Sequence, residues 1–170
     1  MALPEVRSVP AAQAASFGIL ARALRSADAF AVIHPGAGPL GANPRLARTV
    51  REPAGGLSAG IVSVVPANGA VCLRVPFTAG RSAQWFCQPL AAARAGRLVM
   101  ALRPAGPLRA GRQLLVGLVP DGVKDVSVTT AAGPALTVPV RANVYDVQLA
   151  SPRSVSFAPP GAGVRTYPAP

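Results

Sequence analysis

The sequence predicts an α+β domain that is mainly β: an antiparallel sheet, folded as a sandwich or partly open barrel, with two short N-terminal helices. Three observations predict this class. From residue 59 onward, short segments alternate apolar with polar residues, and their starts recur at intervals typical of antiparallel sheets. The dipeptide Asn68-Gly69 lies between two apolar runs and is a strong hairpin signal. The 17 glycines and 19 prolines among 170 residues imply many turns.

Composition divides the chain into a lead-in, one domain and a tail. We expect a flexible lead-in over 1–10, a single domain over 11–157 with a helical part (11–52) and a β-rich part (59–157), and a Pro/Gly-rich tail over 158–170. A chain of this length can bury a hydrophobic core without metals. Because only 5% of the residues are aromatic, that core must be built from Ala, Val and Leu.

Two segments of the helical part carry helix signals. Over 11–25, apolar residues recur at helical spacing, namely Phe17, Leu20, Ala21 and Leu24. Asn43 before Pro44 is typical of an N-cap followed by proline in the first turn, which predicts a second helix over 44–50.

The β-rich part is a succession of short apolar or alternating segments. They predict strands at 61–65, 71–75, 84–87, 98–103, 114–119, 126–129, 136–140, 145–149 and 155–157. The segment 114–119 is continuously apolar, which suits a central strand. Pro139 cannot donate a hydrogen bond, so its strand needs an edge position or a bulge.

The two cysteines predict a disulfide. Cys72 and Cys87 each lie in an apolar segment, and a turn-like stretch at 77–82 separates the segments, so two paired strands would bring the side chains together. An even pair favours a bridge and an oxidising compartment. Two buried free thiols are the alternative. Zinc is poorly supported, because two cysteines and the distant His34 do not complete a four-ligand site.

The net charge of +11 comes from 17 basic residues, of which Lys124 is the only lysine. The arginines are spread along the chain and are not interleaved with aromatic side chains that stack on bases. We therefore expect a solvated basic surface and no specific nucleic-acid site. A nucleic-acid binder would concentrate five arginines on one face: Arg94, Arg97, Arg103, Arg109 and Arg112. No segment reaches the roughly 20 apolar residues that span a bilayer.

Catalytic and cofactor motifs are weak in this sequence. Gly36, Gly38 and Gly41 match the glycine spacing of a dinucleotide site, but Pro39 lies inside the motif and no acidic residue ends the next strand. We expect a plain loop there. His34, the only histidine, would have to serve any Ser–His or Cys–His site, and no nucleophile motif accompanies it.

Two further sets of residues bear on function. Asp125 and Asp146 are expected on outward faces of neighbouring strands, where they could form a hydrolase pair, although pairing with arginines is the more ordinary role of such acids. Trp85 and Tyr145 could form a sugar platform, but single aromatics in strands more often anchor the core.

Two segments carry a resemblance. They are Gly117-Leu118-Val119-Pro120-Asp121-Gly122-Val123 and Val138-Pro139-Val140-Arg141-Ala142-Asn143-Val144-Tyr145. Together they resemble a group of poorly characterised secreted or membrane-anchored proteins of high-GC actinobacteria, in which a cysteine pair often lies upstream. The resemblance implies a β-rich fold and an extracytoplasmic location, and it supplies no catalytic residues.

These observations favour a non-enzymatic module of the cell envelope, structural or binding, whose partner is a protein or an acidic polysaccharide. They predict no catalytic residue, no cofactor, no metal and no transmembrane segment. The predicted location is extracytoplasmic, with a leader or anchor not visible in this chain. Two alternatives stay open: a hydrolase that uses surface carboxylates, and a basic cytosolic protein with non-specific nucleic-acid contacts.

Overall fold

The computed structural model describes residues 3–29, 38–51, 61–76, 83–102 and 112–170. Within them the chain forms three antiparallel sheets and a few short helices, and none of the sheets closes into a barrel. The predicted class, α+β and mainly β, is confirmed. None of the helices in the described ranges is long and apolar enough to cross a membrane.

Sheet A is a meander of four strands in chain order. Its strands are β1 (Arg48–Arg51), β2 (Ile61–Ala67), β3 (Ala70–Pro76) and β4 (Ala83–Pro89), and α4 (Leu90–Arg94) follows. The predicted Asn68-Gly69 turn joins β2 to β3, with Gly69 at a φ of 64°. The left-handed region that this φ occupies favours glycine.

A disulfide links β3 to β4, as the sequence predicts. Cys72 and Cys87 are directly opposite in the strand register, with their Cα atoms 4.0 Å apart. Leu90 N donates to Gly69 O, so these two residues form a hydrogen-bonded pair. Hydrogen-bonded and non-hydrogen-bonded pairs alternate along an antiparallel ladder, which makes Cys72 and Cys87 a non-hydrogen-bonded pair. In such a pair the two side chains approach most closely.

Sheets B and C share the second half of the chain. Sheet B has the order β5 (Val99–Leu102), β6 (Arg112–Leu118), β9 (Val144–Ala150). Sheet C has the order β11 (Arg165–Pro168), β10 (Pro152–Phe157), β7 (Asp125–Thr130), β8 (Gly133–Pro139). Two predictions are confirmed here: β6, the continuously apolar strand, is central in its sheet, and Pro139 lies on the edge strand β8.

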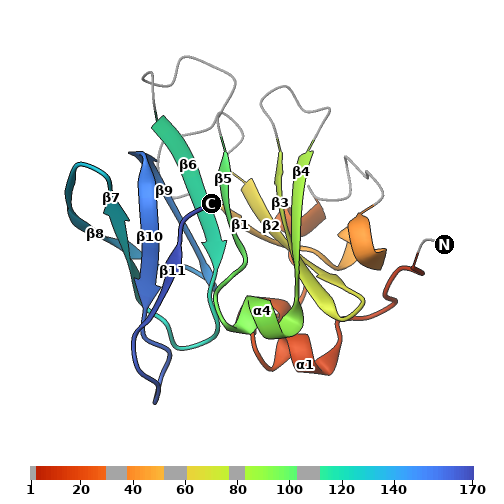
Figure 1. Ribbon diagram of the computed structural model, residues 1–170. Coiled ribbons are helices and arrows are strands. Elements are labelled where there is room, and N and C mark those ends of the chain that lie inside the picture. Colours follow the sequence, from red (N-terminus) through yellow and green to blue (C-terminus); the bar gives the residue numbers. More distant parts are fainter. Residues whose placement is uncertain (1–2, 30–37, 52–60, 77–82, 103–111) are drawn as a thin grey trace.

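The three sheets stack as layers with sheet B in the middle (Figure 1). One core lies between sheets A and B and includes Val64, Leu73, Leu114 and Val116. A second core lies between sheets B and C and includes Leu115, Val126, Val128 and Val155. Successive residues of β6 therefore face different cores, which explains why its sequence is apolar without alternation.

The N-terminal part departs from the predicted helices. The helix expected over 11–25 is two four-residue helices, α1 (Ala11–Ala14) and α2 (Gly18–Ala21). Phe17, between them, is extended and fully buried, so the chain bends to bring that ring into the core. Leu24, on the predicted apolar stripe, is 56% exposed.

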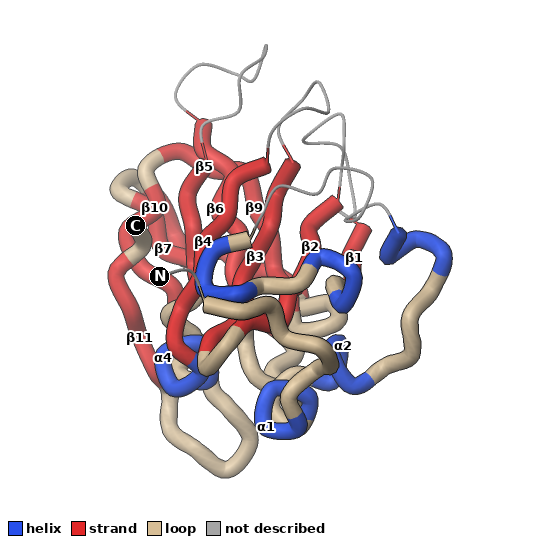
Figure 2. The backbone as a smooth tube through the Cα atoms, turned by 90° about the vertical axis from the view of Figure 1, so that its right-hand side faces the viewer, coloured by secondary structure: helices blue, strands red, loops and turns tan. Residues whose placement is uncertain are grey.

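The helix expected over 44–50 is also wrong. Asn43 caps a 3-10 turn, η3 (Pro44–Leu46), by accepting a hydrogen bond from Arg45 N, and the chain then enters β1. Thr49 and Val50 are β-branched and pair with β2, so sheet pairing wins over the local helix signal. The helical part 11–52 thus contains a strand. The turns η2 (Pro39–Gly41) and η3 belong to a segment that crosses in front of sheet A (Figure 2).

The predicted tail over 158–170 is in part a strand. β11 pairs with β10 through four residue pairs, and Tyr167 packs on the second core. Four of the six Pro and Gly residues of the segment lie in the turn that precedes β11, so composition alone hides this strand.

Candidate functional site

Sheet C has one face in the core and one face in solvent. Val126, Val128 and Val155 point inward, so the residues that alternate with them point outward. Six of the outward residues carry hydroxyl groups: Ser127, Thr129, Thr137, Ser154, Ser156 and Thr166. We call this surface the hydroxyl face.

The strand register aligns four hydroxyls across the hydroxyl face. Ser156 pairs with Thr166 on one side and with Ser127 on the other, and Ser127 pairs with Thr137. Adjacent strands lie about 4.8 Å apart, so the hydroxyls repeat at about that spacing. Ser156 Oγ and Thr166 Oγ1 share a hydrogen bond of 2.9 Å. A hydroxyl has one donor and two acceptor sites, so each group of such a pair keeps capacity for a ligand.

A shorter second row lies beside the first. Thr129 Oγ1 and Ser154 Oγ share a hydrogen bond of 2.7 Å. Mutual hydrogen bonds of this kind fix the orientation of the hydroxyls before any ligand arrives, which lowers the entropy cost of binding.

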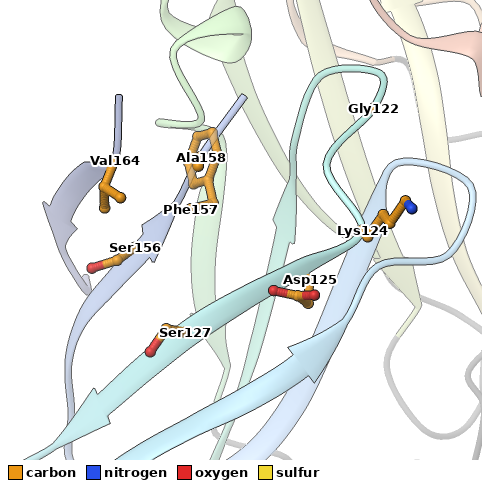
Figure 3. A pocket seen from close by; sticks show the side chains of 8 residues that line it. All are labelled: Gly122, Lys124, Asp125, Ser127, Ser156, Phe157, Ala158 and Val164. Carbon is orange, nitrogen blue, oxygen red and sulfur yellow. The ribbon is translucent and has the colours of Figure 1, made fainter. Parts of the chain in front are cut away.

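A hollow of about 420 Å³ opens beside these rows (Figure 3). It is lined by residues of β7, β10 and the neighbouring turns: Gly122, Lys124, Asp125, Ser127, Ser156, Phe157, Ala158 and Val164. Lys124 also lines the hollow, and its side chain extends away from the Asp125 carboxylate (Figure 3). Val164 is 73% exposed and adds an aliphatic surface. The hollow thus combines a carboxylate, an ammonium group, hydroxyls and an apolar wall.

Asp125 and Asp146 do not come together. Asp125 lies on the outward face of β7 in sheet C. Asp146 is the register partner of Val116, so it shares the face of sheet B that is turned toward sheet A. The expectation of neighbouring strands is wrong, because β7 and β9 belong to different sheets with the second core between them. The two carboxylates of a glycosidase lie within about 10 Å of each other across one shared substrate.

One buried carboxylate has a structural role. Asp28, buried in the turn η1 (Ser26–Ala29), accepts two bonds of 2.8 Å from the Arg22 guanidinium and one each from Arg25 N, Thr49 N and Thr49 Oγ1. Burial alone would raise the pKa of this carboxyl, but the bonds from Arg22, Thr49 and Arg25 outweigh it and hold the pKa well below the usual range. The cluster fastens η1 to β1.

The two segments that carry the sequence resemblance meet at α2. Asp121 Oδ1 accepts hydrogen bonds from Gly18 N at 2.7 Å and from Asn143 Nδ2 at 2.8 Å, and Asn143 Oδ1 accepts from Ile19 N at 3.0 Å. Asn143 has a φ of 68° in the tight turn before β9. These side chains satisfy the first amides of a short helix, so their role is to join loops that are distant in sequence.

The other predicted residues have structural surroundings or lie outside the described ranges. Gly38 precedes the turn η2 and Gly41 is its last residue, and β1 follows η3, so the helix that a dinucleotide site needs is not present there. Tyr145 is buried beside Gly117, and burial raises the pKa of its hydroxyl. Trp85 stacks with Arg74 at 5.8 Å. His34 and Gly36 lie outside the described residues.

The arginines named for nucleic-acid binding do not gather on one face as far as the structure describes them. Arg97 precedes β5 near the carboxyl end of β6, whereas Arg112 begins β6, so the length of a strand separates the two. Arg94 donates hydrogen bonds to Ala12 O in α1 and to Ser16 Oγ just after that helix. Arg103 and Arg109 lie outside the described ranges.

In the part of the chain that the structure describes, no three His, Cys, Asp or Glu side chains lie together in a way that could hold a metal ion. Comparison with protein-family models, curated proteins and solved structures gives no match. The hydroxyl face was missed at the level of sequence, although its signal is present. Within 126–129 and 154–157, Ser and Thr alternate with Val and Phe, which marks strands whose outward side carries hydroxyl groups.

Proposed function

We propose that the chain is a non-enzymatic extracytoplasmic binding module that contacts its partner through the hydroxyl face. The observation that supports this function is the row of aligned hydroxyls backed by fully buried valines. A rigid sheet with preoriented donors and acceptors suits binding of an extended, hydroxylated ligand. The disulfide between Cys72 and Cys87 is compatible with an oxidising compartment, which supports the extracytoplasmic part of the proposal.

The ligand class that fits best is an acidic polysaccharide. The hydroxyl face has no aromatic or arginine anchor of the kind that dominates protein–protein contacts, so a protein partner is less well supported there. Sugar hydroxyls complement the rows, and Val164 offers a surface for the C–H side of a sugar ring. The net charge of +11 attracts an anionic polymer over long range.

The test is a titration of isotope-labelled protein with oligogalacturonate, followed by amide chemical shifts. We expect shifts on β7 and β10, and a loss of affinity of at least about fivefold in the double variant Ser127→Ala, Ser156→Ala, because two ligand hydrogen bonds are removed. The control Ser8→Ala, Ser26→Ala removes two exposed hydroxyls elsewhere. Equal affinity of the two double variants, or binding that disappears at high salt for both, would point to charge alone.

The compartment is tested by the state of the thiols in the cell. Protein trapped in acid directly from the producing cells should take up no alkylating label before reduction and two labels after it. Label on both cysteines before reduction would contradict the extracytoplasmic location.

A further inference from the structure

A second hollow lies where one edge of each sheet meets the others. Its volume is about 460 Å³, and it is lined by Phe86, Arg97, Val99, Tyr167, Pro168, Ala169 and Pro170. Phe86 belongs to β4, Val99 to β5 and Tyr167 to β11, and these strands are the terminal ones of sheets A, B and C. We call this site the edge groove. Open strand edges expose unpaired backbone groups, and proteins ordinarily cover or blunt them.

The backbone of β5 is open toward the edge groove. Leu118 N donates to Leu98 O, so by alternation Leu98, Met100 and Leu102 direct their backbone groups at β6. Val99, which lines the groove, and Ala101, two residues further along β5, then direct their N–H and C=O groups away from β6. The neighbouring strands β11 and β4 offer fewer unpaired backbone groups to the groove. Pro168 of β11 has no N–H, and the backbone groups of Phe86 in β4 are directed at Leu73 of β3.

Charge selects among the extended chains that such an edge could bind. The Arg97 guanidinium is exposed and lies 5.6 Å from the centre of the Tyr167 ring, so the ring holds the cation beside the groove. Arg97 forms no ion pair within the described residues. The groove therefore joins an apolar lining, two open backbone residues and one cation.

We propose that the edge groove binds an extended segment of a partner protein, which adds a short strand to β5 and places a carboxylate side chain on Arg97. Strand addition draws its affinity from main-chain hydrogen bonds and its selectivity from alternate side chains. Here the apolar side chains of the segment would contact Phe86 and Tyr167, while the carboxylate pairs with the guanidinium. This site is separate from the hydroxyl face and does not depend on the function proposed for it.

The probes are capped peptides of about six residues in which Val alternates with Glu or with Lys. With labelled full-length protein we expect the Glu peptide to shift the amide signals of Val99 and Ala101 and to slow their hydrogen exchange. The Lys peptide should bind about fivefold more weakly, the factor that an exposed ion pair of about 1 kcal/mol supplies. Arg97→Gln should abolish this charge preference while leaving binding of both peptides, whereas Arg112→Gln removes the same charge elsewhere and should change nothing.

Methylation of peptide nitrogens separates strand addition from simple charge pairing. Methyl groups on the amides of one side of the Glu peptide should abolish binding, and methyl groups on the other side should not. Unshifted Val99 and Ala101 amides at saturating peptide would overturn the proposal, as would equal binding of the Glu and Lys peptides or equal tolerance of both methylation patterns. None of these results bears on oligogalacturonate binding, so peptide binding at the edge groove and polysaccharide binding at the hydroxyl face are tested independently.

Discussion

β6 and β8 are both seven-residue strands, but their surroundings are opposite. In β6 the last five residues are buried, whereas in β8 only Val138 is buried. β6 lies between two neighbouring strands and between two packed cores, while β8 lies at the edge of a sheet with one face in solvent. The number of neighbouring strands and cores that contact a strand, and not its length, therefore determines how many of its positions must be apolar. Surfaces for ligands can therefore arise in sheet C and at sheet edges without cost to the core.

The largest expected effect compares equal truncations on the two strands. Leu115→Ala in β6 should cost about 2–5 kcal/mol of unfolding free energy, because Leu115 is fully buried between sheets B and C. Leu136→Ala in β8 should cost less than about 0.5 kcal/mol, since Leu136 is 43% exposed. Urea unfolding followed by Trp85 fluorescence measures both. Similar costs would mean that β8 is covered in solution.

A second comparison sets a buried carboxylate against an open one. Asp28→Asn should cost about 3 kcal/mol near neutral pH, because it leaves the Arg22 guanidinium without its charged partner. Asp125→Asn, on the open face, should change stability by less than about 0.5 kcal/mol.

The pH dependence of the Asp28 variant has a definite sign. The pKa of Asp28 is lowered in the folded state, so its contribution is complete above the unfolded value near 3.8 and is lost as the pH falls below that value. The difference in stability between the native protein and Asp28→Asn should therefore shrink in acid. A difference that stays constant down to low pH would show that the Asp28 carboxylate is not stabilised by its charge.

Two glycines in the same strands give a smaller contrast. A Cβ on Gly117 of β6 would overlap with Tyr145 Oη, and that ring is buried, so Gly117→Ala should cost about 1–3 kcal/mol. In β8 a Cβ on Gly133 would meet nothing nearer than Thr130 Oγ1 at 3.6 Å. Gly133→Ala should accordingly be neutral or slightly stabilising in thermal unfolding. A loss from Gly133→Ala as large as that from Gly117→Ala would contradict the open environment of β8.

The smallest effects come from exchanging neighbours within β8. Val138→Thr places a hydroxyl in the second core and should cost about 1 kcal/mol. Thr137→Val, on the hydroxyl face, keeps the β-branched shape and should leave stability within about 0.5 kcal/mol. The same Thr137→Val protein should bind oligogalacturonate more weakly, which separates the role of this hydroxyl in binding from any role in folding.

Local patterns predicted much of the fold. The Asn68-Gly69 hairpin, the Cys72–Cys87 bridge and the edge position of Pro139 all depend on residues close in sequence or on the chemistry of one side chain. The stacking of three sheets was not predictable in this way, because it depends on which strands meet across long separations. The helix predicted over 44–50 failed for the same reason: pairing of β1 with β2 outweighs a local cap.

The candidate site was not predicted from the sequence, although one residue considered for function was placed correctly. Tyr145 was correctly interpreted as a core anchor, since it is 1% exposed. The hydroxyl face escaped prediction because no single serine or threonine in it is unusual. It becomes visible when the register aligns Ser156, Ser127 and Thr137 across three strands. The Asp125–Asp146 pair failed because alternation gives the side of a strand but not the sheet to which it belongs.

The order of the strands along the chain interlaces sheets B and C. After β6 the chain leaves sheet B for β7 and β8, returns for β9 and leaves again for β10, whereas sheet A is built from one uninterrupted stretch. Each of the two interlaced sheets thus contains strands from both sides of the turn at Ala131-Ala132. A protease that cut this turn would leave two fragments held together by the hydrogen bonds of the β6–β9 and β7–β8 pairs. Prepared separately, such fragments would act as complementing halves of one protein.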